Sequence, residues 1–534
     1  MLSDSRRVPP APAASPREPP DSPAPSTDTA HNSDQLQSLV VGGLAWQSVL
    51  TLVTQVTRTV SSLVLVHLLT PRDYGLAGMA LMFTVLFDYF SELGLSSALV
   101  QRQSLSEADR STVFWSNVAM GILLTAVGIS ISGTIAQFFH QPQLRAMFMV
   151  LATTFFITSL GITQAALIHR AMDFRAFSIR MMLGTACGAA TAIAVAASGG
   201  GAWALIAQQV AFASVSTVLL WLLSDWRPRM IYSRTSLRKL GGLGANVLGA
   251  NILDFIHRNT DTLLIGRFLG SASLGIYNVS YTVILFPIGR LMLPVQETLF
   301  PALSRLQADR ARIGQLWLRA VRGITALILP AMLGLIVVAP DFVDVVLGRR
   351  WHAATPIVRI LALVTIAFTL SGVATRVLLA LDRSRLTLYL SVVNTVLAVV
   401  AFSVGLRWGL VGVASCYAAV AIPVQIAFVL FTSRAVGLSV RAFVRNIAGL
   451  AEASCLMAIA CWTCRESLIA AGVPAALRLV VVVGVGVGVY VPAVAWRSRA
   501  TLEEVRRFRS ARRARNASLG REVAVRVDVG LDEL

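Results

Sequence analysis

Apolar segments alternate with short polar turns along most of the chain. Each segment holds about 20 residues, enough to cross the roughly 30 Å hydrocarbon layer of a membrane as an α-helix. The period-two alternation typical of transmembrane strands does not occur. The pattern therefore predicts an all-α polytopic membrane protein with about fourteen spans. We place them near residues 40–69, 75–100, 112–138, 146–168, 178–198, 202–224, 245–269, 274–300, 318–340, 355–380, 386–406, 409–432, 446–470 and 475–496.

The first twelve predicted spans form two halves of six that carry matching residues. Arg58 and Gly75 stand 200 positions before Arg258 and Gly275. The stretch "RAMDFRAF" after the fourth span resembles "LALDRSRL" after the tenth. Because six is an even number, both halves enter the membrane from the same side. This predicts a parallel repeat of two six-helix lobes, with its pseudo-two-fold axis along the membrane normal and two C-terminal helices appended.

The two ends of the chain differ in composition from the predicted spans. The N-terminal stretch is rich in Pro, Ala and Ser and cannot bury a core, which predicts a disordered tail. The stretch after the last span is basic in its first half, which suits either contact with anionic lipid or a solvated tail that enforces orientation. The expected parts are a Pro-rich tail over 1–37, an N-terminal lobe over 38–224, a linker over 225–244, a C-terminal lobe over 245–432, helices 13 and 14 within 433–497, and a basic tail over 498–534.

The formal net charge of +19 is mainly a signal of membrane topology. If both termini are cytosolic, about 20 basic residues lie on cytosolic connectors and about 8 on outer ones. This bias predicts a multi-pass protein of the bacterial cytoplasmic membrane with both termini in the cytosol. A nucleic-acid partner is excluded, because the basic residues are dispersed over helix ends and form no single basic face.

Motifs for catalysis and for nucleotide or metal binding do not occur in the sequence. Its single lysine, Lys239, follows Arg238 and cannot complete a G-x-x-x-x-G-K-[ST] phosphate loop. There is no H-E-x-x-H zinc motif and no G-x-S-x-G elbow, and the six histidines are scattered. Connectors of at most about 20 residues leave no room for a soluble catalytic domain. We expect a protein that is not an enzyme and uses no cofactor or metal.

Polar residues recur on one face of two equivalent spans. An arginine at the centre of a membrane helix costs roughly 2.5 to 3.5 kcal/mol on insertion scales, so it usually faces a cavity or a partner. In the first span, Gln55 and Arg58 lie on one stripe. The stripe of the seventh span consists of Asn251, Asp254, Arg258 and Asp261.

These two stripes predict a cationic cleft between the lobes. Guanidinium groups match phosphate oxygens, so the cleft suits an anionic head group. Arg290 and Arg376, also within predicted spans, extend the set of candidate cations. In the alternative, Arg258 forms a structural ion pair with Asp254 or Asp261, four and three positions away.

Three carboxylates are candidates for ion coupling. Asp88 and Glu92 lie one turn apart in the second span, and Glu297 lies in the eighth. In a partly dry cleft, such groups could exchange a proton during a transport cycle. The alternative is that Glu92 and Glu297, near the ends of their spans, simply reach the membrane interface.

Four segments resemble a known family. They are "LLTPRDYGLAGMALMF", "GLSSALVQR", "DTLLIGRFLGSASLGIYNVSY" and "FPALSRLQADRARI". They are similar to the oligosaccharide flippases of the polysaccharide transporter family, within the multidrug/oligosaccharidyl-lipid/polysaccharide exporter superfamily. The resemblance is greatest to the colanic acid and teichuronic acid exporter branch, and it covers roughly residues 39–445.

The resemblance implies a V-shaped fold with alternating access, in which helices 1, 2, 7 and 8 line a cationic cavity and Arg58 and Arg258 hold matching positions. The implied substrate is an undecaprenyl-pyrophosphate-linked oligosaccharide, such as an exopolysaccharide or O-antigen repeat unit. The implied partners are membrane lipids and the polysaccharide polymerase or export machinery. In related lipid II flippases, two extra C-terminal helices form a lipid groove, and helices 13 and 14 could do so here or merely pack.

Two other functions compete with this one. A drug or cation antiporter of the same superfamily would need an acidic or aromatic cleft, and the paired arginines argue against it. A membrane-embedded polysaccharide polymerase or ligase would need catalytic groups in an outer loop. The candidate loop spans residues 341–354 and carries Asp341, Asp344, Arg349, Arg350 and His352, which we otherwise expect to be solvated.

Overall fold

The computed structural model describes residues 50–91, 99, 105–235, 237, 244–307 and 309–497, and within them it forms helices and turns without a strand. Ten of the described helical segments are long and apolar enough to cross a membrane. After a helix over residues 50–68 come α2 (Pro71–Ser91), α4 (Glu107–Phe138), α5 (Gln143–Arg170), α6 (Phe174–Ala197), α7 (Trp203–Leu223), α9 (Gly244–Phe268), α10 (Gly270–Arg305), α11 (Arg310–Phe342), η2 (Val343–Leu347), η3 (Arg349–Ala354), α12 (Thr355–Ser371), α13 (Ala374–Ala380), α14 (Ser384–Gly405), η4 (Leu406–Trp408), α15 (Gly409–Ala435), α16 (Val440–Ala470) and α17 (Ala475–Arg497).

These elements confirm the all-α class, with helix at each predicted span. The two predicted tails, over 1–37 and 498–534, lie outside the described residues. The predicted span over 355–380 is not one helix, because it breaks between α12 and α13 at Gly372. The side chain of Met292 from α10 fills the space where a Cβ of Gly372 would stand. The side-chain amide of Gln296 donates to the freed carbonyl oxygen of Gly372 at 2.7 Å, which satisfies that group inside the membrane.

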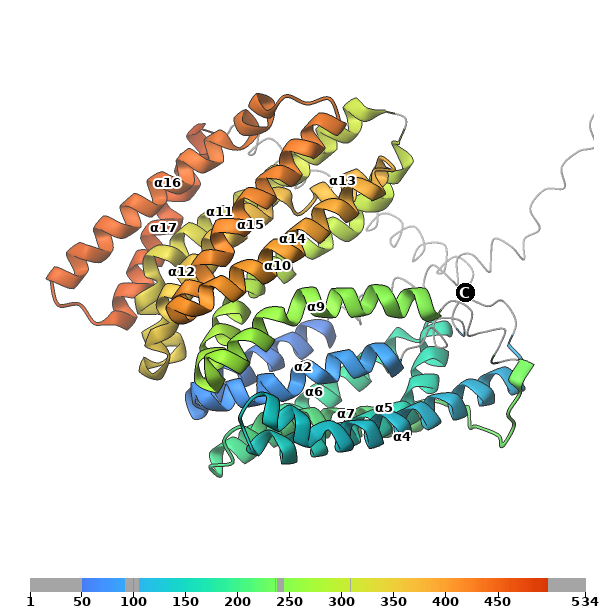
Figure 1. Ribbon diagram of the computed structural model, residues 1–534. Helices are drawn as coiled ribbons and strands as arrows, with labels where there is room; N and C mark the ends of the chain where they lie inside the picture. Colours follow the sequence, from blue (N-terminus) through green and yellow to red (C-terminus); the bar gives the residue numbers. More distant parts are fainter. Residues whose placement is uncertain are drawn as a thin grey trace, which may run out of the picture.

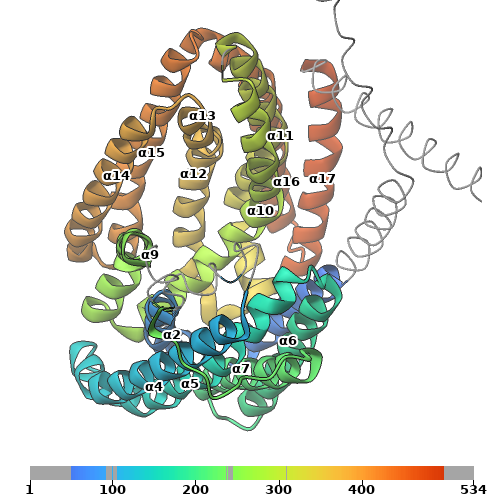
Figure 2. The ribbon, with the colours of Figure 1, turned by 90° about the vertical axis from the view of Figure 1, so that its right-hand side faces the viewer.

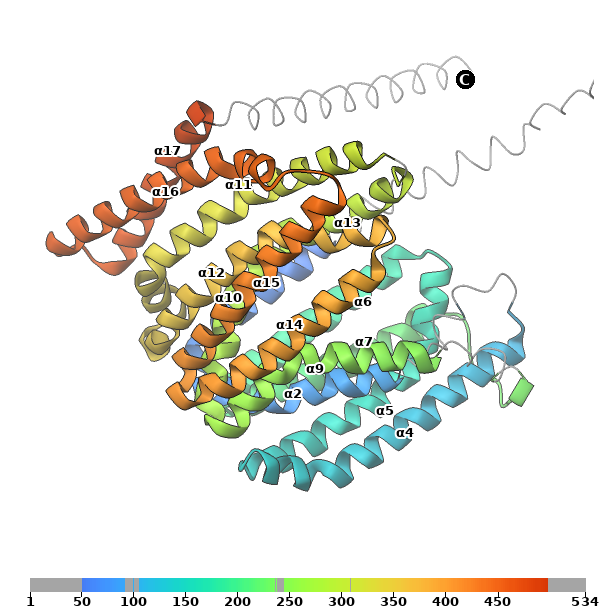
Figure 3. The same ribbon diagram turned by 45° about the horizontal axis from the view of Figure 1, so that its top comes forward.

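The helices form two bundles that meet at one end and diverge from it (Figure 1). The N-terminal bundle contains the helix over 50–68, α2 and α4 to α7, and the C-terminal bundle contains α10 to α15. Between the bundles, α9 contacts both α2 and α14. The last two helices, α16 and α17, pack beside α11 (Figure 2) and form the edge furthest from α4 and α5 (Figure 3).

A reciprocal pair of glycines brings α2 and α10 into backbone contact where the bundles meet. A Cβ on Gly75 would lie 1.7 Å from the carbonyl oxygen of Ser271, and a Cβ on Gly275 would lie 1.8 Å from that of Pro71. Each glycine therefore faces the residue four positions before its repeat equivalent. This contact has the symmetry of the predicted parallel repeat, whose two-fold axis passes between α2 and α10. We call this end of the molecule the closed end.

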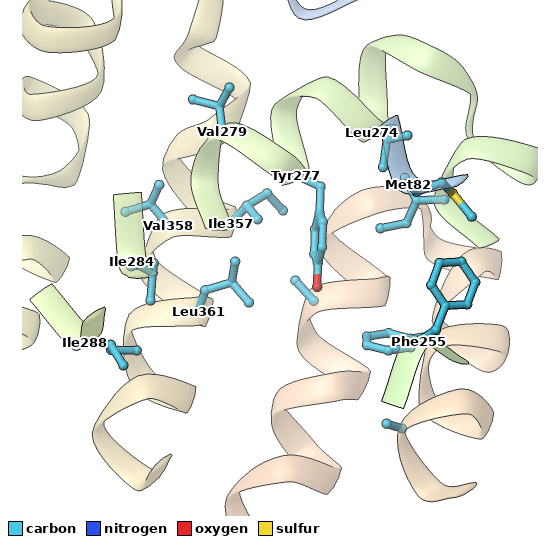
Figure 4. Close-up of a cluster of buried hydrophobic side chains, with 14 of the residues drawn as sticks. Met82, Phe255, Leu274, Tyr277, Val279, Ile284, Ile288, Ile357, Val358 and Leu361 are labelled. Atoms are coloured by element: carbon cyan, nitrogen blue, oxygen red, sulfur yellow. The ribbon is translucent and has the colours of Figure 1, made fainter. Parts of the chain in front are cut away.

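Apolar side chains from both bundles pack next to this contact. Met82 of α2 lies beside Leu274 of α10, with Phe255 of α9 close to them (Figure 4). All three are buried. The bundles are thus joined by a shared apolar core near the closed end as well as by the glycine contact.

The second predicted echo is a repeated turn, displaced by one residue. Met172, after α5, and Asp382, after α13, both adopt positive φ angles, of 54° and 56°. Asp173, which the sequence aligns with Asp382, instead caps α6 by accepting from the backbone N–H of Ala176 at 2.9 Å. The equivalence of the two turns therefore lies in their backbone and not in the shared aspartate.

Helices α16 and α17 are fixed to α11 at several heights. Near one end, Arg322 Nε donates to Asn446 Oδ1 at 2.9 Å, and further along, the Tyr490 hydroxyl donates to the Ala326 carbonyl oxygen at 2.6 Å. At the closed end Asp341 accepts hydrogen bonds from Arg465 and Arg478. The last two helices therefore belong to the C-terminal bundle as a packed unit.

The expectation that Asp341 is solvated is wrong. Asp341 is 2% exposed, and its carboxylate lies 2.6 Å from Arg465 Nε of α16 and 2.9 Å from Arg478 Nε of α17. Packing of these two later helices over the end of α11 removes the aspartate from solvent. Elsewhere in the same connector, His352 remains largely exposed and lies 3.0 Å from Asp344.

Candidate functional site

Arg58 lines a pocket of about 370 Å³ inside the N-terminal bundle. The residue stands ten positions before the end of its helix, which corresponds to about 15 Å, or half of the hydrocarbon thickness. We call this cavity the Arg58 pocket. Its other lining residues come from the same helix, α2, α6 and α7, and are Ser62, Leu65, Tyr74, Thr185, Gly188, Leu205, Gln208, Gln209 and Phe212.

Two glycines of α6 shape the Arg58 pocket. A Cβ on Gly188 would lie 3.0 Å from the carbonyl oxygen of Gln208, and one on Gly184 would lie 3.2 Å from the ring of Phe212. The absence of side chains at these positions lets α7 approach α6 closely. The approach brings two neighbouring amide side chains, Gln208 and Gln209, to the pocket wall.

Several polar groups of the Arg58 pocket have no partner within the part of the chain that the structure describes. Thr185 is 6% exposed, and its Oγ1 is buried without a hydrogen bond. Arg58, Gln208 and Gln209 also make no side-chain hydrogen bond or ion pair there. Thr185 is the buried member of this set, whereas Gln208 and Gln209 are half-buried and Arg58 is exposed. A buried hydroxyl without a partner, next to accessible amide and guanidinium groups, suits a binding site.

On α9, the helix between the bundles, Asp261 lies near tyrosines of α10 and α15. Its carboxylate accepts from the backbone N–H of Thr262 at 2.7 Å. The Tyr277 ring stacks on Tyr281, with 6.2 Å between centroids and 11° between planes. Tyr417 of α15 is close to Tyr281 and Asp261. Asp261 thus has partners other than arginine.

Arg258 is exposed on α9, close to Tyr281. The described lining of the Arg58 pocket comes from the N-terminal bundle and does not include Arg258. The structure therefore does not bring the two arginines together in that pocket. The cleft between the lobes and the ion pair of Arg258 with Asp254 both stay predictions.

For the other predicted site residues, the structure describes the side chains of only two. Gln55 is half-buried on the helix of Arg58, and Arg376 is half-buried on α13. Five further residues lie on α2, α9 or α10 with side chains outside the described set, and Glu92 is not described at all. Those five are Asp88, Asn251, Asp254, Arg290 and Glu297.

An apolar groove of about 490 Å³ runs between α11, α16 and α17. Small residues open it, because Gly334 of α11 meets only the tip of Met457 at 3.7 Å. The groove is lined by Ala326, Leu327, Pro330, Ala331, Gly334, Leu335, Val338, Met457, Cys461, Val482, Val483, Gly486, Val487, Tyr490 and Val491.

The closed end is held by polar contacts between the bundles as well as by glycines. The indole Nε1 of Trp351, in η3, donates to the carbonyl oxygen of Val66 at 3.0 Å. The same indole meets Tyr74 of α2 edge-on, with 5.3 Å between ring centroids. Arg267 of α9 reaches the carbonyl oxygen of Phe138, at the end of α4, and lies against His140.

Comparison with known proteins identifies the family. Residues 64–356, more than half of the chain, match the model of the family described as polysaccharide biosynthesis protein. The chain belongs to this family. It is 27% identical over 353 residues to the teichuronic acid biosynthesis protein TuaB of Bacillus subtilis, covering 66% of this chain and 73% of that protein. It is 24% identical over 372 residues to the lipopolysaccharide biosynthesis protein WzxC of Escherichia coli, covering 69% and 76%.

Solved structures show the same fold. The lipid II flippase MurJ in an inward closed conformation superposes with a TM-score of 0.68 and 14% identity, over 85% of this chain and 99% of that one. An inward-facing multidrug resistance MATE family transporter superposes with a TM-score of 0.57 and 14% identity, over 72% and 94%. The protein is therefore a multi-pass membrane protein of polysaccharide biosynthesis with a V-shaped transporter fold, and it is not an enzyme.

Sequence patterns did not indicate most of the Arg58 pocket. Gln208, Gln209 and Thr185 are polar but uncharged residues in apolar spans, and such residues also serve helix packing. The signal that could have found them is the adjacent pair of amides in α7, which is unusual within a membrane helix.

Proposed function

We propose that the protein moves an undecaprenyl-pyrophosphate-linked oligosaccharide, a repeat unit of an exopolysaccharide or O-antigen, across the bacterial cytoplasmic membrane by alternating access. Arg58 is the observation that carries this proposal. Its guanidinium is exposed, about 15 Å from the end of its helix, at a pocket lined by polar and apolar residues, and it has no ion-pair partner among the described residues. A cation placed there suits a pyrophosphate, whose oxygens match the guanidinium fork.

The proposed orientation places both termini in the cytosol. The connectors at the end opposite the closed end carry most of the basic residues, as the positive-inside bias requires of cytosolic connectors. On this basis the closed end faces outward, and the structure corresponds to a state open toward the cytosol. A substrate made on the cytosolic face would enter this state.

The two parts of the proposed substrate need different environments during transport. The sugar and pyrophosphate need a polar path, because burying them unpaired in hydrocarbon costs several kcal/mol per polar group. The polyprenyl tail can remain in the membrane, and the apolar groove between α11 and α17 suits it. Membrane lipids and the polysaccharide polymerase or export machinery are the partners expected for such a protein.

An ion gradient would drive the cycle in this proposal. Asp88, Glu92 and Glu297 remain the candidate coupling residues, and Arg290 and Arg376 remain candidate contacts of the anionic head group.

Two features disfavour the competing functions. In the outer connector proposed for a polymerase or ligase, Asp341 is engaged by Arg465 and Arg478 and serves helix packing. A drug or cation antiporter is disfavoured by the Arg58 pocket, whose described lining contains a cation and no carboxylate.

The test is a leaflet-resolved assay of lipid-linked oligosaccharide in cells. It compares wild type, Arg58→Ala, Arg258→Ala and the double variant at equal protein abundance, measured by blot. Accumulation in the inner leaflet in the arginine variants, with the double variant most affected, is the expected result. Normal turnover in the double variant would remove both arginines as head-group contacts, and normal turnover after deletion of the whole gene would end the proposal.

A further inference from the structure

We infer that the Arg58 pocket is a recognition subsite for the sugar that is attached directly to the pyrophosphate of the substrate. This inference rests on the proposed function, which supplies the lipid-linked substrate. It adds specificity-determining residues that the sequence pattern did not indicate, namely Gln208, Gln209, Thr185 and Phe212.

The polar groups of the pocket match a sugar better than they match a second phosphate. Each glutamine amide offers both donors and an acceptor, and each sugar hydroxyl is likewise a donor and an acceptor. Gln208 and Gln209 make no side-chain hydrogen bond within the described part of the chain, so their capacity is open to a ligand. Thr185 adds a buried hydroxyl without a partner there.

The apolar part of the lining also suits a sugar ring. Phe212 and Tyr74 supply aromatic surface in the same cavity, and Leu65 and Leu205 complete its wall. A pyranose has apolar faces of C–H groups between its hydroxyls, so a site with aromatic walls and a few polar groups can bind it. The volume of about 370 Å³ lies at the lower end of the range for ligand pockets, which favours one sugar ring over a whole oligosaccharide.

Arg58 fixes which sugar occupies this subsite. It contributes the single cation of the described lining, beside polar residues Ser62 and Thr185. If its guanidinium binds the pyrophosphate, then the only sugar within reach of the amides is the one bonded to that pyrophosphate. The pocket would therefore contact and recognise the first sugar of the repeat unit, and it would make no contact with the distal sugars.

The test measures binding of defined lipids to the full-length protein in nanodiscs. The probes are undecaprenyl pyrophosphate and its glucosyl, galactosyl and N-acetylglucosaminyl derivatives. We expect wild type to bind at least one glycosylated lipid about tenfold more tightly than undecaprenyl pyrophosphate, the increment that a few hydrogen bonds supply. The double variant Gln208→Ala with Gln209→Ala should lose this preference while still binding the sugar-free lipid. Arg58→Ala should weaken binding of every probe.

A matched pair of substitutions on α6 guards against a folding artefact. Thr185→Val keeps the shape of the side chain and removes the unpartnered hydroxyl, so it should reduce the sugar preference several-fold. Thr191→Val is the control, because the Thr191 hydroxyl donates to the Cys187 carbonyl oxygen at 2.9 Å and does not line the pocket.

The outcomes separate the inference from the proposed function. If wild type binds undecaprenyl pyrophosphate but gains nothing from any sugar, or if the double variant keeps the preference, the subsite is wrong and the proposed function stands. If wild type binds none of the lipids, the proposed function fails and the subsite fails with it.

Discussion

The indole of Trp351 in the C-terminal bundle donates to the backbone carbonyl of Val66 in the N-terminal bundle, 3.0 Å away. Trp351 is completely buried and also contacts Tyr74. A side chain of one bundle that is buried against the other must leave its site whenever the closed end opens. The pair is therefore a conformational lock whose strength can be measured.

Trp351→Phe should shift the population toward a conformation in which the two bundles have separated at the closed end. The change keeps an aromatic ring but leaves the Val66 carbonyl without its donor, and one net hydrogen bond corresponds to a population shift of about two- to tenfold. Distances between spin labels at Trp203 and Trp408, in a cysteine-free background, would report the opening. Trp462→Phe, at an exposed position of α16, is the control and should leave the distance distribution unchanged.

Gly75→Ala should keep the two bundles from meeting at the closed end, and its effect should exceed that of losing the Trp351–Val66 hydrogen bond. A Cβ there would lie 1.7 Å from the Ser271 carbonyl oxygen. The clash cannot be relieved by a rotamer change, because the neighbouring atoms belong to the backbone of α10. The same spin-label pair should show mainly the long distance, and transport should fall at least tenfold because the cycle cannot return to this state. Gly133→Ala, which has open space around its Cβ, is the matched control. A Gly75→Ala protein that still closes would show that this contact is not the one that seals the end.

Much of the fold could be predicted from local patterns, but contacts between distant segments could not. The length of an apolar run predicts a span, so hydropathy located the helices that the described residues form, and the repeat identified Gly75 and Gly275 as equivalents. Nothing local showed that each glycine would touch the other half. Asp341 was expected to be solvated because it adjoins a loop, whereas Arg465 and Arg478, more than a hundred residues later, cover it. The Arg58 pocket was missed in part for the same reason, since the facing of Gln208 depends on how α7 packs on α6.

Asp341→Asn should loosen the attachment of α16 and α17. The buried carboxylate is shared by Arg465 and Arg478, whose side chains are 12% and 16% exposed. Neutralising it removes the carboxylate partner of Arg478 and leaves Arg465 only its half-exposed neighbour Glu466. Breaking a buried ion pair typically costs about 3 to 5 kcal/mol, which should appear as a clearly lower thermal midpoint in detergent. The control is Glu452→Gln, whose partner Arg497 is half-exposed and whose loss should be nearly neutral. An unchanged midpoint for Asp341→Asn would mean that apolar packing alone holds these helices.

Gly334→Leu should reduce substrate turnover if the groove beside α17 holds the polyprenyl tail, as proposed. A leucine there would extend into the groove and meet only the mobile tip of Met457, at 3.7 Å from the Cβ, so the protein should still fold. Lipid tails are as apolar as the groove, so packing and not transfer from water would hold the tail there. For that reason we expect a partial loss of about two- to fivefold in the leaflet assay, not abolition. Gly323→Leu lies on the same helix, outside the groove and with open space around it, and should leave turnover unchanged. Equal turnover in both variants would confine the tail to the surrounding bilayer and leave α16 and α17 a packing role alone.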